Sequence, residues 1–352
     1  MRVINVRNVH LALPKGLSLL QEYGVIRNSR NGPVTVMEEP VTTKYTRPKE
    51  RVMFWAERDA NPFFHFFESL WMMAGRNDLA FLTQFVKRFA DFSDDGVILH
   101  GAYGHRWFNH FNEDGYDLLP DQLAIIVDRL TRWPEDRRSV LQMWDPEADL
   151  GQDSKDVPCN LTAHFQRNRE GALDMTVFCR SNDIIWGAYG ANAVHFSVLQ
   201  EWVAAAIGCK MGKYWQISDN FHAYHTTMVP LMDKFYGENS KDPTIREFNP
   251  YNYEDIRTYP LVSVEATLWL KECEHFITYP GADHEYNEPF FERVARPLYA
   301  AHEAHKHRDY TPAIRLAEQC WATDWRKAAI EWLKRREQSY KKAQDDGPDY
   351  TT

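Results

Sequence analysis

The sequence predicts an α+β fold in two parts, a mixed core over residues 1–263 and a helical extension over residues 264–352. Residues 161–179 alternate apolar and polar side chains around a turn, which is the pattern of a β-hairpin. Residues 123–130 instead repeat apolar side chains at helical spacing. From about Val264 the sequence consists of helical segments rich in Trp, Glu, Arg and Lys, so we expect an extension that packs on the core.

Composition narrows the classes of protein that the chain can represent. It has 352 residues, of which 44% are hydrophobic and 14% aromatic, and its formal net charge is −9. This length fits one large domain or two, and the apolar content is too high for a disordered chain. The negative charge argues against a general nucleic-acid binder, whose affinity depends on a basic surface. Any bound phosphate would therefore need a local cluster of arginines.

Apolar runs and cysteines indicate the compartment. No apolar run reaches the ~20 residues that cross a bilayer, and Met1–Asn5 leads directly into polar sequence, without a signal peptide. The five cysteines have neither the spacing of a disulfide framework nor that of a zinc ribbon. They are Cys159, Cys179, Cys209, Cys273 and Cys320. We therefore expect a reducing, cytoplasmic compartment and neither a membrane nor a nucleic-acid partner.

The first third of the chain contains one clear helix. An Arg- and Asn-rich turn over residues 27–32 precedes the extended segment Val34–Val36. Asn61-Pro62 then opens an aromatic helix that ends near Gly75, because Gly is the expected stop residue.

The middle of the chain alternates helices and strands. We predict an amphipathic helix over Asp121–Trp133, directly after Pro120, and a strand over Ser139–Trp144. The hairpin turns at Asn168–Gly171. Asn192–Gly208 is apolar on almost every side, which predicts a buried helix, and Lys213–Ile217 reads as a strand.

The C-terminal third is helical, including the segment Thr311–Lys342, and ends in a polar tail, Asp345–Thr352, that we expect to be mobile. Its tryptophans at 321, 325 and 332 indicate a packing stripe rather than a cofactor site. The basic run Lys334-Arg335-Arg336 is expected to form a solvated helical face.

The sharpest chemical signal is Pro158-Cys159, set between two predicted strands. A cysteine acts as a covalent nucleophile where nearby arginines lower the pKa of its thiol. Arg180, at the end of the following strand, and the pair Arg137-Arg138 supply such charge, and adjacent arginines can clamp a phosphate. Taken singly, a lone cysteine is more often a buried apolar residue and a lone arginine a solvated charge.

Seven motifs between residues 25 and 235 favour a catalytic role for Cys159 and the arginines, because they follow one another in a known order. They are Phe67-Glu68-Ser69-Leu70-Trp71, Tyr103-Gly104-His105-Arg106-Trp107, Asp121-Gln122-Leu123, Asp136-Arg137-Arg138, Pro158-Cys159, Arg180-Ser181-Asn182-Asp183 with Gly187, and His222-Ala223-Tyr224. In this order they resemble the thymidylate synthase family. The resemblance implies a thymidylate synthase-like α+β fold with a large mixed sheet at the interface of a homodimer.

The resemblance also implies the reaction. Cys159 adds to C6 of a pyrimidine nucleoside monophosphate, and C5 then attacks the one-carbon unit of 5,10-methylenetetrahydrofolate. Catalytic roles follow for Cys159, Glu68, Tyr103 and Asp183, with Glu68 organising the waters that move protons. The implied substrate-binding residues are Arg27, Arg137, Arg138, Arg180, Ser181, Asn192, His222 and Tyr224. The implied cofactor-binding residues are Asp183, Trp186 and Gly187.

Within this resemblance, the arginines and Ser181 hold the 5′-phosphate, with Arg137 and Arg138 reaching across the dimer interface. His222 and Tyr224 bind the sugar hydroxyl, and Asp183 contacts the pterin. Ser181 and Arg138 favour a deoxyribonucleotide.

Three departures from the family pattern bear on the product. The family's Cys-His is Cys159-Asn160 here, the two tryptophans of the folate side are Phe89 and Phe92, and the apolar C-terminal closure is replaced by residues 348–352. In a methylating enzyme that closure excludes water while folate delivers its hydride. Its absence favours capture of the exocyclic methylene by water, as in the deoxypyrimidylate hydroxymethylase branch typical of phages, which would act in the host cytoplasm.

The base is read in the loop after Gly187. In the family an Asn amide reads uracil and an Asp carboxylate reads cytosine. Gap-free counting places Ala191 at this position and Asn192 one residue later, so Asn192 serves only if the loop is shifted. The loop contains no Asp, which favours dUMP and its conversion to 5-hydroxymethyl-dUMP.

Other functions stay open at this stage. dCMP hydroxymethylation and a methylating synthase differ only in base and product, whereas an inactive nucleotide-binding module is a different class of protein. Two histidine groups lack a carboxylate or cysteine partner at the spacing of metal ligands, so no metal site is expected. They are His100, His105 and His110, and His302, His305 and His307.

Overall fold

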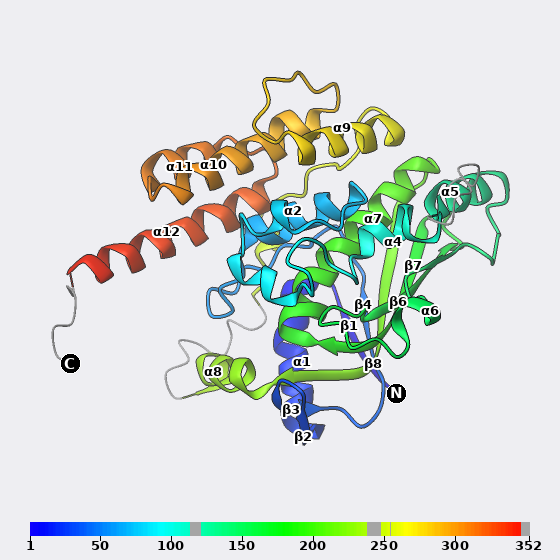
Figure 1. Ribbon diagram of the computed structural model, residues 1–352, viewed down its shortest axis with the longest axis horizontal. Helices are drawn as coiled ribbons and strands as arrows, with labels where there is room; N and C mark the ends of the chain where they lie inside the picture. Colours follow the sequence, from blue (N-terminus) through cyan, green and yellow to red (C-terminus); the bar gives the residue numbers. More distant parts are fainter. Residues whose placement is uncertain (113–120, 238–247, 254, 346–352) are drawn as a thin grey trace.

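The computed structural model describes residues 1–112, 121–237, 248–253 and 255–345 (Figure 1). Within them, eight strands form one mixed sheet, in which six follow the order β1-β4-β8-β7-β6-β5 and the hairpin β2-β3 joins through β3 to β8. The strands are β1 (Arg2–Val6), β2 (Val25–Ser29), β3 (Gly32–Val36), β4 (Val41–Tyr45), β5 (Val140–Gln142), β6 (Asn160–Arg167), β7 (Leu173–Asp183) and β8 (Met211–Tyr224). The mixed α+β class predicted from the sequence is confirmed.

The helices lie between and around these strands. They are α1 (Val9–Tyr23), α2 (Pro62–Met73), α3 (Leu79–Leu82), α4 (Tyr103–Phe108), α5 (Gln122–Arg132), α6 (Pro146–Asp149), α7 (Asn192–Ala206), α8 (His225–Tyr236), α9 (Ala266–Thr278), α10 (Arg296–Lys306), α11 (Tyr310–Glu318) and α12 (Thr323–Asp345). None of the helices in the described ranges is both long and apolar enough to cross a membrane.

Helix α2 is the centre of the hydrophobic core, and all of its residues are buried. It starts at Pro62 because the Asn61 side chain accepts hydrogen bonds from the Phe63 and Phe64 N–H groups. Its neighbours are α7 on the sheet side and α9, α10 and α12 of the C-terminal region. Figure 1 shows the C-terminal helices along one side of the molecule and the sheet on the other, with α2 between them.

The parallel pair β7-β8 forms the middle of the sheet and brings two distant motifs together. Their register places Ser181 opposite Asn220 and Asp183 opposite His222. The carboxyl ends of both strands therefore lie at the same edge of the sheet, next to the start of β6.

Most predicted elements are confirmed. The hairpin is β6-β7, with a Gly171 of positive φ (75°) in its turn. The helices predicted at 61–75, 121–133 and 192–208 are α2, α5 and α7. The extended segment Val34–Val36 is part of β3.

Several boundaries were wrong. Residues 27–29 are not a turn but part of β2, because they pair with residues 32–34 of β3. The strand predicted at Lys213–Ile217 is the 14-residue β8, while the one at Ser139–Trp144 shortens to Val140–Gln142. The helical segment 311–342 breaks between α11 and α12. Most of the expected mobile tail, residues 346–352, and Pro120 lie outside the described residues.

The predictions for the C-terminal tryptophans and basic residues are correct only in part. Trp325 and Trp332 are buried as predicted, whereas Trp321 is 58% exposed, with the Arg293 guanidinium 4.3 Å from its ring centre. Arg335 and Arg336 are not simply solvated, because both form ion pairs with Asp59 in the segment that precedes α2.

Candidate active site

Cys159 lies directly before β6, and two side chains fix its backbone. The N–H groups of Cys159 and Asn160 both donate to the Tyr103 hydroxyl oxygen, at 3.3 Å each. Arg180 donates from Nε to the Pro158 carbonyl (2.9 Å) and from Nη2 to the Val157 carbonyl (3.0 Å). The predicted nucleophile, Tyr103 and Arg180 are therefore brought together.

The electrostatics of Cys159 differ from the sequence-based expectation. Burial raises the pKa of its thiol, and the nearby Arg180 guanidinium only partly offsets this effect. Arg180 directs its donors at the carbonyls of Val157 and Pro158, which precede Cys159 in the nucleophile loop (residues 157–159). In the free protein the thiol therefore stays protonated over a wider pH range than an ordinary cysteine.

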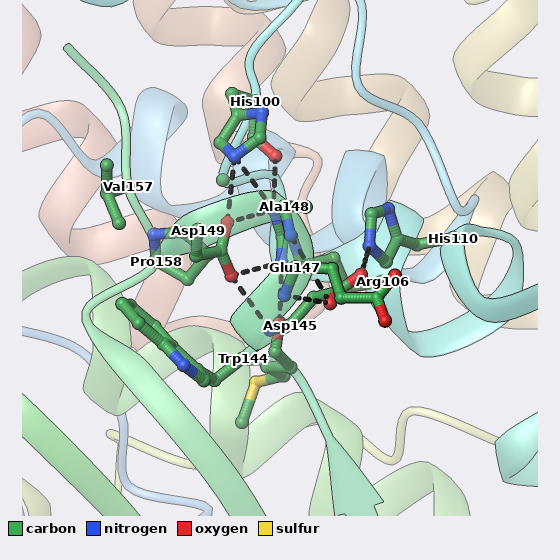
Figure 2. Close-up of polar contacts among 12 residues, drawn as sticks. His100, Arg106, His110, Trp144, Asp145, Glu147, Ala148, Asp149, Val157 and Pro158 are labelled. Carbon is green, nitrogen blue, oxygen red and sulfur yellow. Dashed lines mark hydrogen bonds and ion pairs between the residues drawn. The ribbon is translucent and has the colours of Figure 1, made fainter. Parts of the chain in front are cut away.

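A buried ion pair lies beside Val157 and Pro158 (Figure 2). Arg106 of α4 binds both carboxylate oxygens of Asp149, at 2.7 and 2.8 Å, and both side chains are fully buried. His100 lies 2.8 Å from the same carboxylate, and the Asp145 N–H donates to it. This cluster ties α4, which carries Tyr103, to the segment that leads into Cys159. The sequence motif contained Arg106 but gave no sign of its partner.

Two of the histidines for which no metal role was expected have carboxylate partners. His100 contacts Asp149, and His110 lies 2.8 Å from Asp145. In the described parts of the chain, no group of three or more His, Cys, Asp or Glu residues could hold a metal ion.

Glu68, a predicted catalytic residue, lies on α2 and is 4% exposed. Its carboxylate is 2.8 Å from Nε2 of His195 on α7, which is also buried. Glu68 was predicted from the sequence, whereas His195 was not. A histidine on an otherwise buried helix face is the signal that could have found it.

Asp183, Trp186 and Arg58 meet at the end of β7. The Asp183 carboxylate accepts a hydrogen bond from the Ile185 N–H (3.0 Å), and burial raises its pKa although His222 and Arg58 act in the opposite direction. Arg58 donates to the Ile185 carbonyl (3.0 Å) and lies 4.6 Å from the centre of the exposed Trp186 ring. Arg58 was missed because it belongs to none of the sequence motifs.

The segment η3 (Ile184–Ala191) settles where Asn192 lies. It is a π-helical turn, in which hydrogen bonds span one residue more than in an α-helix. Asn192 is the first residue of α7 and is buried, with Nδ2 3.3 Å from Asn182 Oδ1. A Cβ on Gly187 would lie 2.8 Å from Asn182 Oδ1 and 3.2 Å from Asn192 Nδ2, so a larger residue would collide with this pair.

The sugar-side residues gather around the end of β8. His222 is buried, and its ring lies 5.4 Å from that of Tyr224. Val34 pairs with both Tyr224 and Arg27, so Arg27 lies two strands from Tyr224 on the same face of the sheet. Arg27 is exposed and forms a 3.2 Å ion pair with Glu38.

Arg137 and Arg138 are predicted site residues that the single chain does not bring near Cys159. Both are exposed and precede β5, whose antiparallel register with β6 runs from Val140 opposite His164 to Gln142 opposite Thr162. Continued by two residues, this register puts Arg138 beside residue 166, roughly 20 Å along the strand from Cys159. Neither arginine can reach a ligand on Cys159 of the same chain.

The two phenylalanines assigned to the folate side lie near each other on the surface of α2. Their ring centres are 5.8 Å apart, Phe89 packs on Phe64 of α2, and Phe92 is 51% exposed.

The chain belongs to the thymidylate synthase family, whose sequence model, described as thymidylate synthase, matches residues 17–265. More narrowly, it is 48% identical over 361 aligned residues to the deoxyuridylate hydroxymethyltransferase of Pseudomonas phage M6, covering 99% of this chain and 100% of that protein. It is 32% identical to the protein of the same name from Delftia phage PhiW-14, over 82% of this chain and 81% of that protein. The corresponding protein of Bacillus phage SP01 is 36% identical over 59% of this chain and 57% of its own length.

Proposed function

We propose that this protein transfers a one-carbon unit from 5,10-methylenetetrahydrofolate to C5 of dUMP and hydrates it, yielding 5-hydroxymethyl-dUMP. The observation that carries the proposal is the full-length similarity to the phage M6 protein, which is named for this activity. The site agrees with it, since the nucleophile Cys159, the carboxylate Glu68 and the amide Asn192 all lie in the region that the family match covers.

The residues fit a folate ligand. Trp186 presents an exposed ring backed by Arg58, which gives a flat aromatic surface for a pterin or its benzoyl group. Nη2 of Arg58 is buried and has no hydrogen-bond partner among the described residues. Asp183 would accept hydrogen bonds from pterin N–H groups, and Gly187 keeps the backbone accessible. When bound, the folate supplies a methylene group at the oxidation level of formaldehyde.

The chain's own residues perform the remaining steps. Cys159 forms a bond to C6 of the base, and Tyr103 and Arg180 hold the backbone that carries it. Because burial raises the thiol pKa, formation of the thiolate requires a further positive or hydrogen-bonding contribution on nucleotide binding. Glu68 orients water and moves protons near C5. Asn192 reads the base by donating its amide N–H to O4 of uracil, while His222 and Tyr224 bind the sugar.

We also propose that the phosphate site is completed in a homodimer. Arg27, Arg180 and Ser181 come from one chain, and Arg137 and Arg138 come from its partner through the exposed face of the sheet. The roughly 20 Å separation of Arg138 from Cys159 within one chain supports this arrangement. Residues 264–352 would form an extension on the catalytic core, consistent with a family match that ends at residue 265. The five unpaired cysteines suit a reducing cytoplasm.

The test is a competition between dUMP and dCMP in the presence of 5,10-methylenetetrahydrofolate, with products identified by mass spectrometry. We expect a hydroxymethyl gain on dUMP, release of tritium from C5, and loss of both in Cys159→Ala. Reaction of dCMP instead would contradict the role of Asn192. A methyl gain with formation of dihydrofolate would contradict hydration. No turnover of either nucleotide would leave a binding module.

A further inference from the structure

Glu68 has a hydrogen-bonding partner, His195, that belongs to none of the seven sequence motifs. Nε2 of His195 lies 2.8 Å from Glu68 Oε2, and the two residues are 127 positions apart in the chain. Only 2% of His195 and 4% of Glu68 is exposed. The contact forms where α2 packs against α7, so both backbones are fixed by the core.

The surroundings define the direction of this hydrogen bond. An ionised carboxylate only accepts, so Nε2 of His195 carries the proton and donates it to Glu68. Nδ1 of His195 is buried without a partner among the described residues. The neighbouring side chains on α2 and before it are His65 and Arg58. Burial, Arg58 and His195 together lower the pKa of His65 to about 3, so His65 stays neutral beside the pair.

A buried polar atom without a partner costs free energy, and such atoms are rare in folded proteins. Leu or Met at position 195 would remove the buried Nδ1 but would also remove the hydrogen bond to Glu68. Because residues 193–199 of α7 are all buried, an apolar side chain would suit packing alone, so the imidazole has a purpose other than packing.

We propose that His195 is a positioning residue, which holds one oxygen of Glu68 so that the other oxygen faces the water that attacks the one-carbon unit. The proposal rests on the proposed function and deepens it. In this step the water oxygen forms a bond to the exocyclic methylene carbon and its proton passes to Glu68. The electron pair moves into the ring, then returns to form the C5–C6 double bond as the C6–Sγ bond breaks and Cys159 leaves as the thiolate.

The experiment compares His195→Leu with His195→Gln in the full-length protein. Gln places an amide N–H close to the position of Nε2 and can still donate to Glu68, whereas Leu cannot. His302 serves as the matched control. It is also a buried histidine, and its ring centre lies 4.4 Å from that of Phe85. It belongs to α10, whereas Glu68 and His195 belong to α2 and α7. Thermal unfolding and the KM for dUMP are measured for each variant.

We expect His195→Leu to lower the kcat for 5-hydroxymethyl-dUMP by about 100-fold while the KM for dUMP changes by less than about 3-fold. His195→Gln should recover most of this loss, and His302→Leu should keep the wild-type kcat. A kcat of His195→Leu near that of the wild type overturns the proposal. Equal losses in the Leu and Gln variants, with a parallel loss of stability, also overturn it, because they indicate a packing role.

Failure of the proposed function gives a different result. A wild-type protein that forms only the methyl product would refute hydration, yet the Leu and Gln variants would still be compared by tritium release from C5. If they differ there as expected, His195 positions Glu68 for proton transfer in the methylating reaction. If they do not differ, the positioning role is wrong as well.

Discussion

The nucleophile region and the start of α12 each bury a carboxylate, but they balance its charge in different ways. Asp149 is fully buried and is bound by two nitrogens of Arg106. Asp324 is also buried, but its hydrogen bonds come from the uncharged Tyr251 hydroxyl (3.0 Å) and the Trp325 N–H (2.8 Å). The neighbouring Arg51 forms its own ion pair with Glu201.

The pKa values follow this difference. Hydrogen bonds and charge from Arg106 outweigh burial and lower the pKa of Asp149. At Asp324 burial dominates and raises the pKa from 3.8 to about 7. Asp149, near the nucleophile loop, therefore ionises more readily than an ordinary carboxyl group. Asp324, in the C-terminal region, resists ionisation. The comparison shows that a buried carboxylate keeps its charge where an arginine pairs with it and loses it where its hydrogen-bond partners are neutral.

The largest effect on stability should come from breaking the ion pair between Arg106 and Asp149. Asp149→Ala leaves the Arg106 guanidinium buried without its carboxylate, and we expect a loss of about 3–5 kcal/mol in the free energy of unfolding. Urea denaturation measures it. The double variant Arg106→Met with Asp149→Leu removes both charges and should cost less than the single variant. A single variant as stable as the wild type would refute the structural role of the pair.

A pH experiment tests Asp324, the buried carboxylate without an arginine partner in its hydrogen bonds. In the unfolded chain Asp324 ionises near pH 4, but in the folded protein it ionises only near pH 7. Ionisation therefore favours the unfolded state, and stability is lost as the pH rises from about 4 to about 7, by a few kcal/mol at 1.36 kcal/mol per pH unit. Below pH 4 both states are protonated, and above pH 7 both are ionised, so the loss stays constant.

Asp324→Asn removes this titration while it keeps a group of the same size. The difference in unfolding free energy between Asp324→Asn and the wild type should shift in favour of the variant between pH 5 and pH 8. The pH slope is the diagnostic quantity, because it does not depend on any constant packing cost of the substitution. Parallel pH profiles for the two proteins would show that Asp324 titrates normally.

The smallest effect should come from the exposed ion pairs of α12. Arg335 lies 3.0 Å from Asp59, and Arg336 also binds this carboxylate, with all three side chains about one third exposed. Each arginine should contribute less than about 1 kcal/mol because solvent screens the pair. Arg335→Ala is compared by thermal unfolding with Lys341→Ala, an exposed pair with Glu337 on the same helix. A cost of several kcal/mol for Arg335→Ala would mean that α12 depends on this tether.

Local sequence patterns were sufficient for much of the fold. The β6-β7 hairpin, helix α2 with its Asn61-Pro62 start, and the buried helix α7 were predictable because each depends on a repeat or an end signal within a few residues. The order of the motifs around Cys159 likewise indicated the family before any contact was known.

Contacts between distant segments were decided only by the tertiary structure. The partners of Glu68 and Arg106 lie 127 and 43 positions away, so no local pattern contains them. The contact between Asn192 and Asn182 likewise joins the start of α7 to β7 across the segment η3. Sequence determined which groups the chain carries, and packing decided which of them meet, because burial selects one face of each helix and one register of each strand.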